Sequence, residues 1–286
     1  MSKALIIYFS QGGTTARVAE AIGAGLRGAE YQVDLRQMKD GRLPEPSDYD
    51  LLGIGSPVYY FGLPLNVTEY VEGLPDLSGI PTFTFVLHGT YRGSAGNLLR
   101  RALARKGAQE VGHFHCRGTD LFLGYLKQGY LFSPDHPTPE ELAQAEVFGR
   151  EAAAHSLGSQ YFAAEYDRRP PVVYCLERLF TGPWLASNLY SRLFRADGEK
   201  CTACGLCMKL CPTKNISRSD AEHPVWGRNC LLCLTCELKC PEEAITSVLS
   251  WSMFLPFLIY NVRRASRDPL LDHVRVVHHG GRTQRV

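Results

Sequence analysis

Eight of the ten cysteines in the sequence fall into two runs of identical spacing. The first run contains Cys201, Cys204, Cys207 and Cys211, the second contains Cys230, Cys233, Cys236 and Cys240, and a proline follows the last cysteine of each. Three thiolates placed at every third residue can wrap three iron corners of one cubane cluster, while the fourth, followed by proline, points away to a second cluster. The spacing therefore predicts two [4Fe-4S] clusters with crossed ligand sets.

The spacing of both runs is that of bacterial ferredoxins, and it assigns each cysteine to a cluster. One cluster would be held by Cys201, Cys204, Cys207 and Cys240, and the other by Cys230, Cys233, Cys236 and Cys211. Structural zinc is the alternative, but zinc sites pair two C-x-x-C knuckles across a longer loop, and a third nearby cysteine would crowd the ion. Apolar residues between the ligands, such as Leu206 and Leu232, would exclude water. Such clusters transfer one electron at a time, usually at low potential.

A loop near the start of the sequence has the residues of a phosphate-binding turn. It lies between a predicted strand and a predicted helix and contains Ser10, Gln11, Gly12, Gly13, Thr14 and Thr15. Backbone N–H groups, hydroxyls and the helix dipole can hold a phosphate there. The loop lacks the Gly-Lys-Ser/Thr ending of a P-loop and the G-x-G-x-x-G dinucleotide fingerprint. Because it has no lysine, it favours the single phosphate of flavin mononucleotide (FMN); an ordinary strand-to-helix turn is the alternative.

Two later loops follow predicted strands at their carboxyl ends, where open α/β sheets bind ligands. Aromatic side chains there can stack on a flavin ring, and glycines let backbone groups approach its polar edge. The candidate flavin contacts are Pro57, Val58, Tyr59, Tyr60, Phe61, Gly62, Gly89, Thr90, Tyr91 and Gly93, and the candidate catalytic residues are His88 and Tyr91. Core packing is the alternative for one of the three aromatics at 59–61, and an inert loop histidine is the alternative for His88.

The elements that would position these loops alternate between strand and helix over the first half of the chain. Short apolar runs predict strands at 4–9, 32–37, 51–56, 82–87 and 110–116. Helical periodicity and a Thr-Pro-Glu-Glu start predict helices at 14–27, 66–73, 95–106 and 139–154. Strand and helix in repetition favour a parallel sheet covered on both faces. The expected fold is a doubly wound five-stranded parallel α/β sheet, followed by a small α+β two-cluster domain.

Four segments are expected along the chain. They are an FMN-binding domain at 1–165, an apolar connector at 166–194, a two-cluster domain at 195–247, and an apolar segment with a basic tail at 248–286 that packs on the domains. The loop at 120–136 is far longer than a strand-to-helix link requires. It would cover the flavin or a substrate, or dock the cluster domain. The basic residues of the tail are Arg263, Arg264, Arg267, Arg275, Arg282 and Arg285.

Composition excludes several classes of protein. The 286 residues are 45% hydrophobic and 21% charged, which is typical of a globular protein of about two domains. A formal net charge of +2 is far from the basic excess of a nucleic-acid binder. The N-terminal apolar run is too short for a signal peptide, and the apolar stretch at 248–262 is shorter than the roughly 20 residues of a spanning helix. A cytoplasmic protein without a transmembrane segment is expected.

Residues 1 to about 160 resemble flavodoxin-like domains. The loop Ser10–Thr15 is similar to the phosphate loop of that family, although Gly12 replaces the usual threonine and Thr14 the usual asparagine, which loses a hydroxyl and an amide. Over nearly its full length the chain resembles flavodoxin/ferredoxin fusion proteins, in which a flavin domain precedes a module with two [4Fe-4S] clusters. The resemblance implies a flavodoxin-like sheet, a ferredoxin-like second domain, and FMN with two clusters as cofactors.

One-electron clusters joined to a flavin predict an electron-transfer iron-sulfur flavoprotein. Electrons would pass between the clusters and FMN and onward to a partner reductase. The alternative is an FMN-dependent reductase that acts on its own small organic substrate, with the clusters as the entry for electrons. A redox sensor or scaffold is a third reading. The expected partner is a redox protein that donates or accepts electrons, and the chain could also pair with a second copy of itself.

Overall fold

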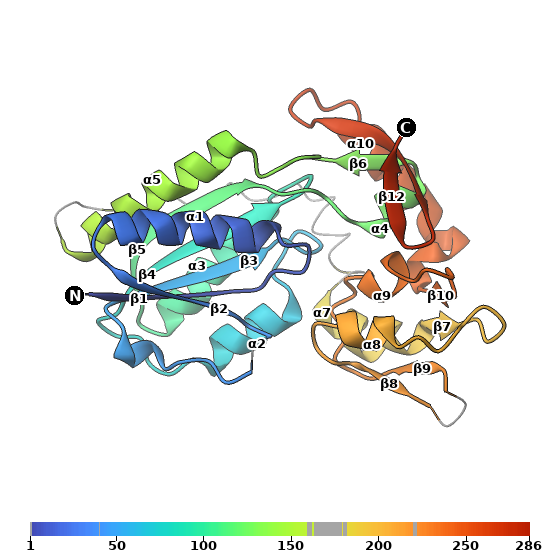
Figure 1. Ribbon diagram of the computed structural model, residues 1–286, viewed down its shortest axis with the longest axis horizontal. Coiled ribbons are helices and arrows are strands. Elements are labelled where there is room, and N and C mark those ends of the chain that lie inside the picture. Colours follow the sequence, from blue (N-terminus) through green and yellow to red (C-terminus); the bar gives the residue numbers. More distant parts are fainter. Residues whose placement is uncertain (1, 40, 159–161, 163–178, 180–181, 220–221) are drawn as a thin grey trace. The chain divides into compact units, whose positions relative to one another are not determined.

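The computed structural model describes residues 2–39, 41–158, 162, 179, 182–219 and 222–286 (Figure 1). The chain divides into two compact units. The first contains Met1–Thr119 and Asp135–Arg178, and the second contains Asp120–Pro134 and Leu179–Val286. A segment within the first half of the sequence, Asp120–Pro134, therefore belongs to the second unit.

The first unit is built on five parallel strands in the order β2-β1-β3-β4-β5. Their bounds are Lys3–Tyr8 for β1, Gln32–Gln37 for β2, Leu51–Pro57 for β3, Pro81–His88 for β4 and Gln109–Arg117 for β5. The central strands are buried on both faces, which requires apolar runs without alternation. The strand order reverses beside β1, so the sheet is doubly wound and flavodoxin-like, as predicted.

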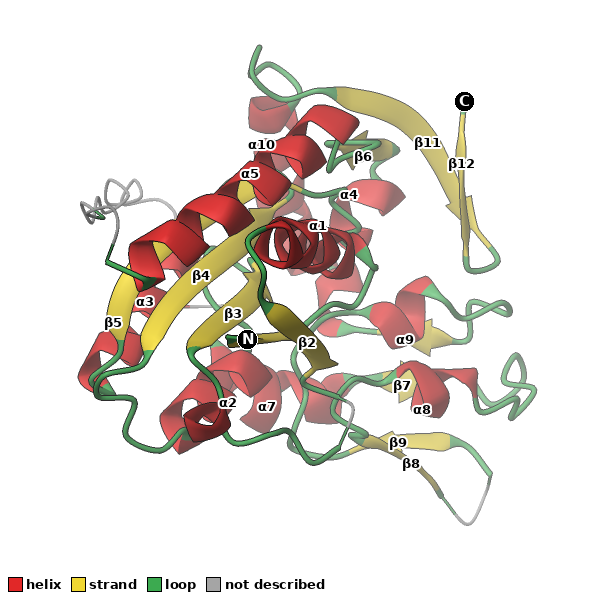
Figure 2. Ribbon diagram, turned by 60° about the vertical axis from the view of Figure 1, so that its left-hand side comes forward, coloured by secondary structure: helices red, strands yellow, loops and turns green. Residues whose placement is uncertain are grey.

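Helices cover both faces of this sheet (Figure 2). Their bounds are Thr14–Gly28 for α1, Leu65–Gly73 for α2, Ala95–Arg105 for α3 and Pro139–Ser156 for α5, with a short 3-10 turn η1 at Pro46–Asp48. On one face, Ile22 and Leu26 of α1 and Ala152 of α5 are buried against Phe83 and Phe85 of β4. Burial of such side chains contributes about 1.5–3 kcal/mol each, so this layer holds the phosphate loop and the strand ends in place.

The edge strand β5 places a largely buried histidine beside β4. The Nδ1 atom of His113 lies 2.7 Å from the hydroxyl of Thr84. Burial, followed by the positive charge of Arg100, lowers the pKa of His113 from 6.5 to about 3. The folded chain therefore keeps this imidazole neutral, whereas the unfolded chain binds a proton below about pH 6.5.

We expect this histidine to make the chain labile to acid. A group with a lowered pKa stabilises the fold above its unfolded pKa, and that stability is lost as the pH falls toward the folded pKa. Between pH 7 and pH 5, the wild type should lose about 2 kcal/mol more unfolding free energy than His113→Gln. Urea unfolding followed by circular dichroism measures the difference. An equal loss in the two proteins would contradict this assignment.

The second unit consists of short elements. Its strands are β6 at Tyr130–Phe132, β7 at Arg195–Ala196, β8 at Ile216–Arg218, β9 at Pro224–Trp226, β10 at Ile245–Thr246, β11 at His273–His279 and β12 at Arg282–Arg285. Its helices are α4 at Leu123–Lys127, α7 at Pro183–Asn188, α8 at Leu206–Leu210, α9 at Thr235–Leu238 and α10 at Leu255–Ala265, with 3-10 turns at Tyr190–Leu193, Val248–Ser250 and Ser252–Phe254. Antiparallel pairs join β7 to β10 and β8 to β9. The first pair joins the two ends of the cysteine-rich segment, and the second lies between its two cysteine runs.

The segment at 120–134 belongs to the second unit, whereas the boundary at residue 165 expected from the sequence places it in the first domain. Its strand β6 pairs with β11 of the C-terminal segment, with Tyr130 opposite Arg275 and Phe132 opposite His273. The guanidinium of Arg275 also lies 4.2 Å from the centre of the Tyr130 ring. These backbone and ring contacts build the long loop and the C-terminal tail into one sheet of the second unit.

Thr119 and His136 mark where this segment leaves and re-enters the first unit. The N–H and the hydroxyl of Thr119 both donate to the carbonyl oxygen of His136, at 3.2 and 3.1 Å. Within the second unit, the N–H of Asp120 donates to the carbonyl oxygen of Phe132 at 3.0 Å. The two ends of the segment are therefore held together at the crossing, which is the place where the chain passes from the first unit to the second and returns.

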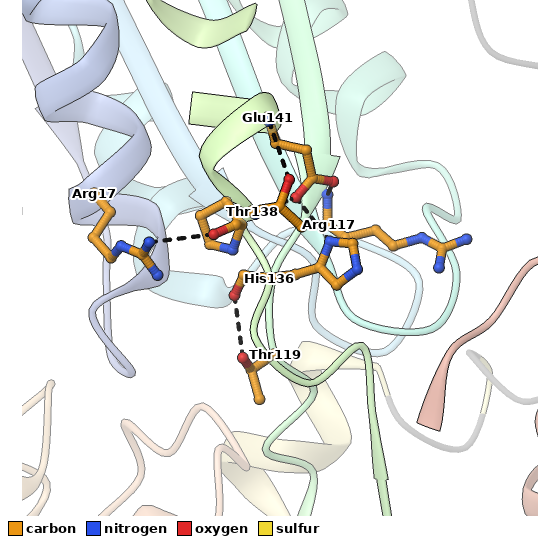
Figure 3. Close-up of polar contacts among 7 residues, drawn as sticks. Arg17, Arg117, Thr119, His136, Thr138 and Glu141 are labelled. Carbon is orange, nitrogen blue, oxygen red and sulfur yellow. Dashed lines mark hydrogen bonds and ion pairs between the residues drawn. The ribbon is translucent and has the colours of Figure 1, made fainter. Parts of the chain in front are cut away.

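The carboxylate of Glu141 fixes the first-unit side of this crossing (Figure 3). It accepts hydrogen bonds from the N–H of Arg117 at 3.2 Å and the N–H of Thr138 at 2.8 Å, and it lies 2.7 Å from Nδ1 of His136. The hydroxyl of Thr138 accepts from the N–H of Glu141 in return, which completes a capping box at the start of α5. The end of β5, the returning chain and α5 are thus joined at one point.

Most of the predicted connector, at 166–194, lies outside the described residues. Its described part forms α7 and the 3-10 turn Tyr190–Leu193, and its packing between the domains stays a prediction. Within the described residues, no helix combines the length and the apolar character that a bilayer crossing requires.

Candidate functional site

The first candidate loop follows β1 and leads into α1. Gly13, the residue before the helix, has a φ of 88°, in the left-handed region that favours glycine. The N–H of Ala16 donates to the Ser10 hydroxyl at 3.2 Å, which curls the loop over the first turn of the helix. No acidic side chain lies in that turn. The remaining N–H groups and the positive end of the helix dipole therefore suit an anion.

The second candidate loop follows β3 and contains a tight aromatic turn. The N–H of Tyr59 donates to the carbonyl oxygen of Gly62 at 2.9 Å, and the N–H of Gly62 donates back to Tyr59 at 2.8 Å. Between them, Tyr60 and Phe61 have φ values of 47° and 60°. Bulky residues in the left-handed region cost about 1–3 kcal/mol each, and such strain gathers at ligand sites. The turn fixes where these aromatic side chains lie.

The third candidate loop follows β4 and packs on the aromatic turn. Ser94 donates to the carbonyl oxygen of Phe61 through its N–H at 2.8 Å and its hydroxyl at 3.2 Å. Gly93 has a φ of 60°, and a Cβ added there would lie 2.3 Å from the same carbonyl oxygen. Gly93 was predicted at this site and Ser94 was not, because a serine directly before a helix indicates a cap of that helix, whereas the Ser94 hydroxyl makes no such cap and bonds to the preceding loop.

Tyr59 connects the aromatic turn to the phosphate loop. Its hydroxyl donates to the side-chain carbonyl of Gln11, and its ring meets that of Phe9 edge to face, with centres 6.1 Å apart. From the end of β5, Gly118 also approaches the phosphate loop, since a Cβ there would lie 3.2 Å from the Thr14 hydroxyl. The structure thus brings the three predicted loops together at the carboxyl ends of the strands.

We expect Tyr59→Phe to weaken FMN binding about fivefold. The variant removes the hydrogen bond to Gln11, worth about 1 kcal/mol, and leaves the phosphate loop less well fixed. Titration of the apoprotein with FMN, followed by flavin fluorescence, measures the change. Tyr49→Phe is the matched control, because Tyr49 precedes β3, at the opposite end of that strand from the aromatic turn, and donates to Asp34 at 2.6 Å. Equal weakening in both variants would show that the effect is not local.

His88 ends β4 beside the third loop and is only 9% exposed. Burial and then the guanidinium of Arg92 lower the pKa of His88 from 6.5 to about 3. The imidazole is therefore neutral at physiological pH and cannot serve there as a protonated acid. Its Nδ1 atom has no hydrogen-bond partner among the described residues. Tyr91 lies in the same loop and is half-buried; catalytic roles for both residues stay predictions.

The cysteines of the second unit line two separate pockets, and the sets are crossed. One pocket is lined by Cys201, Cys204, Cys207 and Cys240, and the other by Cys211, Cys230, Cys233 and Cys236. The fourth cysteine of each run therefore lies with the first three of the other run, as the spacing predicts. Within the described part of the chain, no three histidine, cysteine or acidic side chains converge closely enough to hold a single metal ion.

The two cysteine runs share one backbone conformation. The residues on either side of the second cysteine are left-handed in both runs: Ala203 and Gly205 in the first, and Leu232 and Leu234 in the second. The fourth cysteines also match, because each sulfur accepts a hydrogen bond from the N–H four residues on, at 3.2 Å for Cys211 and 3.4 Å for Cys240. This repeated conformation turns backbone N–H groups toward sulfur atoms, which stabilises negative charge on them.

The electrostatics of the second pocket favour a bound cationic metal cluster. Burial, together with the neighbouring thiols Cys233 and Cys211, raises the pKa of Cys230 to about 12. Burial likewise raises the pKa of Cys236 well above its ordinary value. Four thiolates in this pocket therefore need positive charge among them, and iron would supply it. The donor set fits an iron-sulfur cluster.

Comparison with known proteins finds matches to two separate parts of the chain. Residues 5–128 match the family described as a flavodoxin domain, and residues 200–245 match the family described as a 4Fe-4S dicluster domain. No curated protein matches the chain significantly. The chain is similar to a solved flavodoxin from the domain Archaea, with 21% identity and a TM-score of 0.43, over 54% of this chain and 99% of that one.

Two further solved structures are similar over about half of the chain. For flavodoxin 1 from Bacillus cereus, the identity is 22% and the TM-score 0.43, over 54% of this chain and 99% of that one. For two-electron reduced flavodoxin from Megasphaera elsdenii, the identity is 20% and the TM-score 0.41, over 52% of this chain and 98% of that one.

The two family matches support an electron-transfer flavoprotein in general. The match to a flavodoxin domain precedes the match to a 4Fe-4S dicluster domain along the chain. The first implies FMN and the second implies iron-sulfur clusters as cofactors.

Proposed function

We propose that this chain passes electrons between two [4Fe-4S] clusters and FMN, and onward to a partner reductase. The crossed lining of the two cysteine pockets carries the proposal, because it supplies four sulfurs to each of two clusters. The clusters carry single electrons, and bound FMN accepts or donates one or two. The chain is thus suited to convert between one-electron and two-electron chemistry.

The loops of the first unit supply the FMN site in this proposal. The phosphate would be held by the residues from Ser10 to Thr15, through N–H groups at the start of α1 and hydroxyls. The ring would lie against the aromatic turn and the loop after β4. The proposed ring contacts are Pro57, Val58, Tyr59, Tyr60, Phe61, Gly62, Gly89, Thr90, Tyr91 and Gly93.

The chain links the two proposed kinds of cofactor site covalently. It passes from the first unit to the second after Thr119 and returns before Asp135, and the contact between Thr119 and His136 holds this crossing together. Linked modules meet at a high effective concentration without a new interface. Electron transfer within one chain therefore needs no diffusional encounter.

A redox partner would dock on the basic tail. Its arginines, namely Arg263, Arg264, Arg267, Arg275, Arg282 and Arg285, are all exposed. Exposed charge of one sign steers an oppositely charged partner and speeds association. We therefore expect the partner to present an acidic surface, and its affinity to fall as salt rises.

A second function, reduction of a small organic substrate at the flavin, is favoured by one observation. The Nδ1 atom of His88 is buried without a partner among the described residues, beside the loop proposed to hold the ring. A neutral imidazole there could hydrogen-bond a substrate. The segment at 120–134, which was expected to cover the flavin or a substrate or to dock the cluster domain, belongs to the second unit, so it adds no observation in favour of substrate reduction.

An anaerobic redox titration of the full chain, followed by absorbance and EPR, tests the proposal. If FMN serves one-electron transfer to a partner, a one-electron reduced flavin should accumulate above the statistical level. Direct passage to the two-electron reduced flavin, with the clusters titrating at lower potential, would favour substrate reduction instead. A chain that binds FMN but no iron would contradict both functions.

A further inference from the structure

Glu237 is a buried carboxylate directly beside a proposed cluster ligand. It follows Cys236 on α9, so the two Cα atoms are about 3.8 Å apart, and its side chain is only 3% exposed. An uncompensated negative charge at such a depth costs several kcal/mol. The residue therefore requires partners, and the structure supplies them.

Three contacts satisfy this carboxylate. Oε2 accepts a hydrogen bond from the N–H of Ser247 at 3.1 Å, and Oε1 accepts one from the Ser250 hydroxyl at 2.9 Å. Oε1 also forms an ion pair with the ammonium of Lys127, which in turn lies 2.9 Å from the Ser250 hydroxyl. Within the described residues, no other cation forms an ion pair with Glu237.

Lys127 comes from the segment that the sequence places in the flavodoxin half. It ends α4 and lies inside the flavodoxin match at 5–128, yet it belongs to the second unit. Two backbone contacts hold the segment there: the N–H of Val276 donates to the carbonyl oxygen of Gly129 at 3.1 Å, and the N–H of Ser133 donates to that of Asp272 at 2.9 Å. The pairing of β6 with β11 adds further hydrogen bonds. The ammonium group is therefore held at a fixed place.

We infer that Lys127 is a positioning residue for electron transfer, which with Glu237 sets the reduction potential of the cluster proposed at Cys211, Cys230, Cys233 and Cys236. Adding an electron to a cluster is disfavoured by a nearby buried negative charge and favoured by a positive one. Lys127 cancels the charge of Glu237 and so keeps this cluster reducible. This inference rests on the proposed function, since it requires the cluster.

A purely structural role for Lys127 predicts a different pattern of effects. If Lys127 only holds the segment in place, its removal would disturb both clusters to the same extent or neither of them. An electrostatic role acts through the charge and falls off with distance. It moves the potential of the nearby cluster and leaves that of the cluster at Cys201, Cys204, Cys207 and Cys240 in place.

An EPR-monitored redox titration of the full chain, reconstituted with iron and sulfide, separates the two roles. Lys127→Met should lower one potential only, with at least a tenfold loss in the equilibrium constant for reduction, which is 59 mV for one electron. Lys127→Arg should keep the wild-type value. Glu237→Gln should raise the same potential, and the double variant Lys127→Met/Glu237→Gln should return close to wild type.

Lys214→Met is the matched control, because Lys214 lies three residues after Cys211 and is exposed, as Lys127 is, but among the described residues it pairs with no buried carboxylate. Its loss leaves no buried negative charge without a partner, so it should shift the potential far less. Unchanged potentials in Lys127→Met, or equal shifts of both clusters, would overturn the inference. If Lys127→Met fails to keep its iron, Glu237→Gln decides, since an unchanged potential there overturns the inference as well. A wild-type chain without iron would overturn the proposed function together with it.

Discussion

The double variant Cys211→Ser/Cys230→Ser is expected to keep about four of the roughly eight iron atoms that two [4Fe-4S] clusters contain. Both cysteines line the same pocket, so removing them together destroys one cluster and leaves the other with all four of its sulfurs. The variant Cys240→Ser/Cys230→Ser removes one sulfur from each pocket. We expect it to keep no intact cluster.

This pair of variants distinguishes crossed from uncrossed ligation. If each run of four cysteines held its own cluster, the results would be reversed, with iron lost from Cys211→Ser/Cys230→Ser and half kept in Cys240→Ser/Cys230→Ser. Iron analysis and low-temperature EPR after anaerobic reconstitution give the answer. Cys116→Ser is the control, because its buried thiol lies in the core of the first unit.

Gly93→Ala is expected to weaken FMN binding by roughly a hundredfold. Two effects combine at this position: a non-glycine residue is strained at a φ of 60°, and its Cβ would lie 2.3 Å from the carbonyl oxygen of Phe61. Because a backbone atom cannot yield as a flexible side chain does, the aromatic turn must move. A cost of about 3 kcal/mol corresponds to the stated loss of affinity.

Gly73→Ala provides the matched control for this prediction. Gly73 ends α2, and a Cβ added there meets nothing within 4 Å. FMN affinity of both variants is measured by fluorescence titration, and circular dichroism checks that the first unit is folded. Affinity for FMN in Gly93→Ala equal to that in Gly73→Ala would show that the aromatic turn does not contact the flavin.

The first-unit sheet was predictable because its signals are local. The central strands β1 and β3 are short, largely apolar runs, and the Thr138-Pro-Glu-Glu start of α5 forms the capping box that its sequence indicates. The crossed grouping of the cysteines was also predictable, since the spacing and the two prolines define it. The local pattern was sufficient in these places because local and tertiary preferences agree.

That the segment at 120–134 belongs to the second unit was not predictable from its sequence. Its strand β6 has only three residues, and its partner β11 begins at His273, far along the chain. No periodicity within the segment indicates that it pairs with so distant a strand. The positive φ values of Tyr60 and Phe61 were equally hidden, because bulky residues normally avoid this region and only tertiary contacts hold them there.

Transfer of electrons between the clusters and the flavin is tested most directly by the rate of flavin reduction. The full chain is mixed rapidly and anaerobically with reduced ferredoxin, and the flavin absorbance is followed. Cys204→Ala and Cys233→Ala should keep bound FMN but lose its fast reduction, whereas Cys116→Ser should react at the wild-type rate. Flavin reduction at the same rate in all four proteins would contradict electron transfer through the clusters.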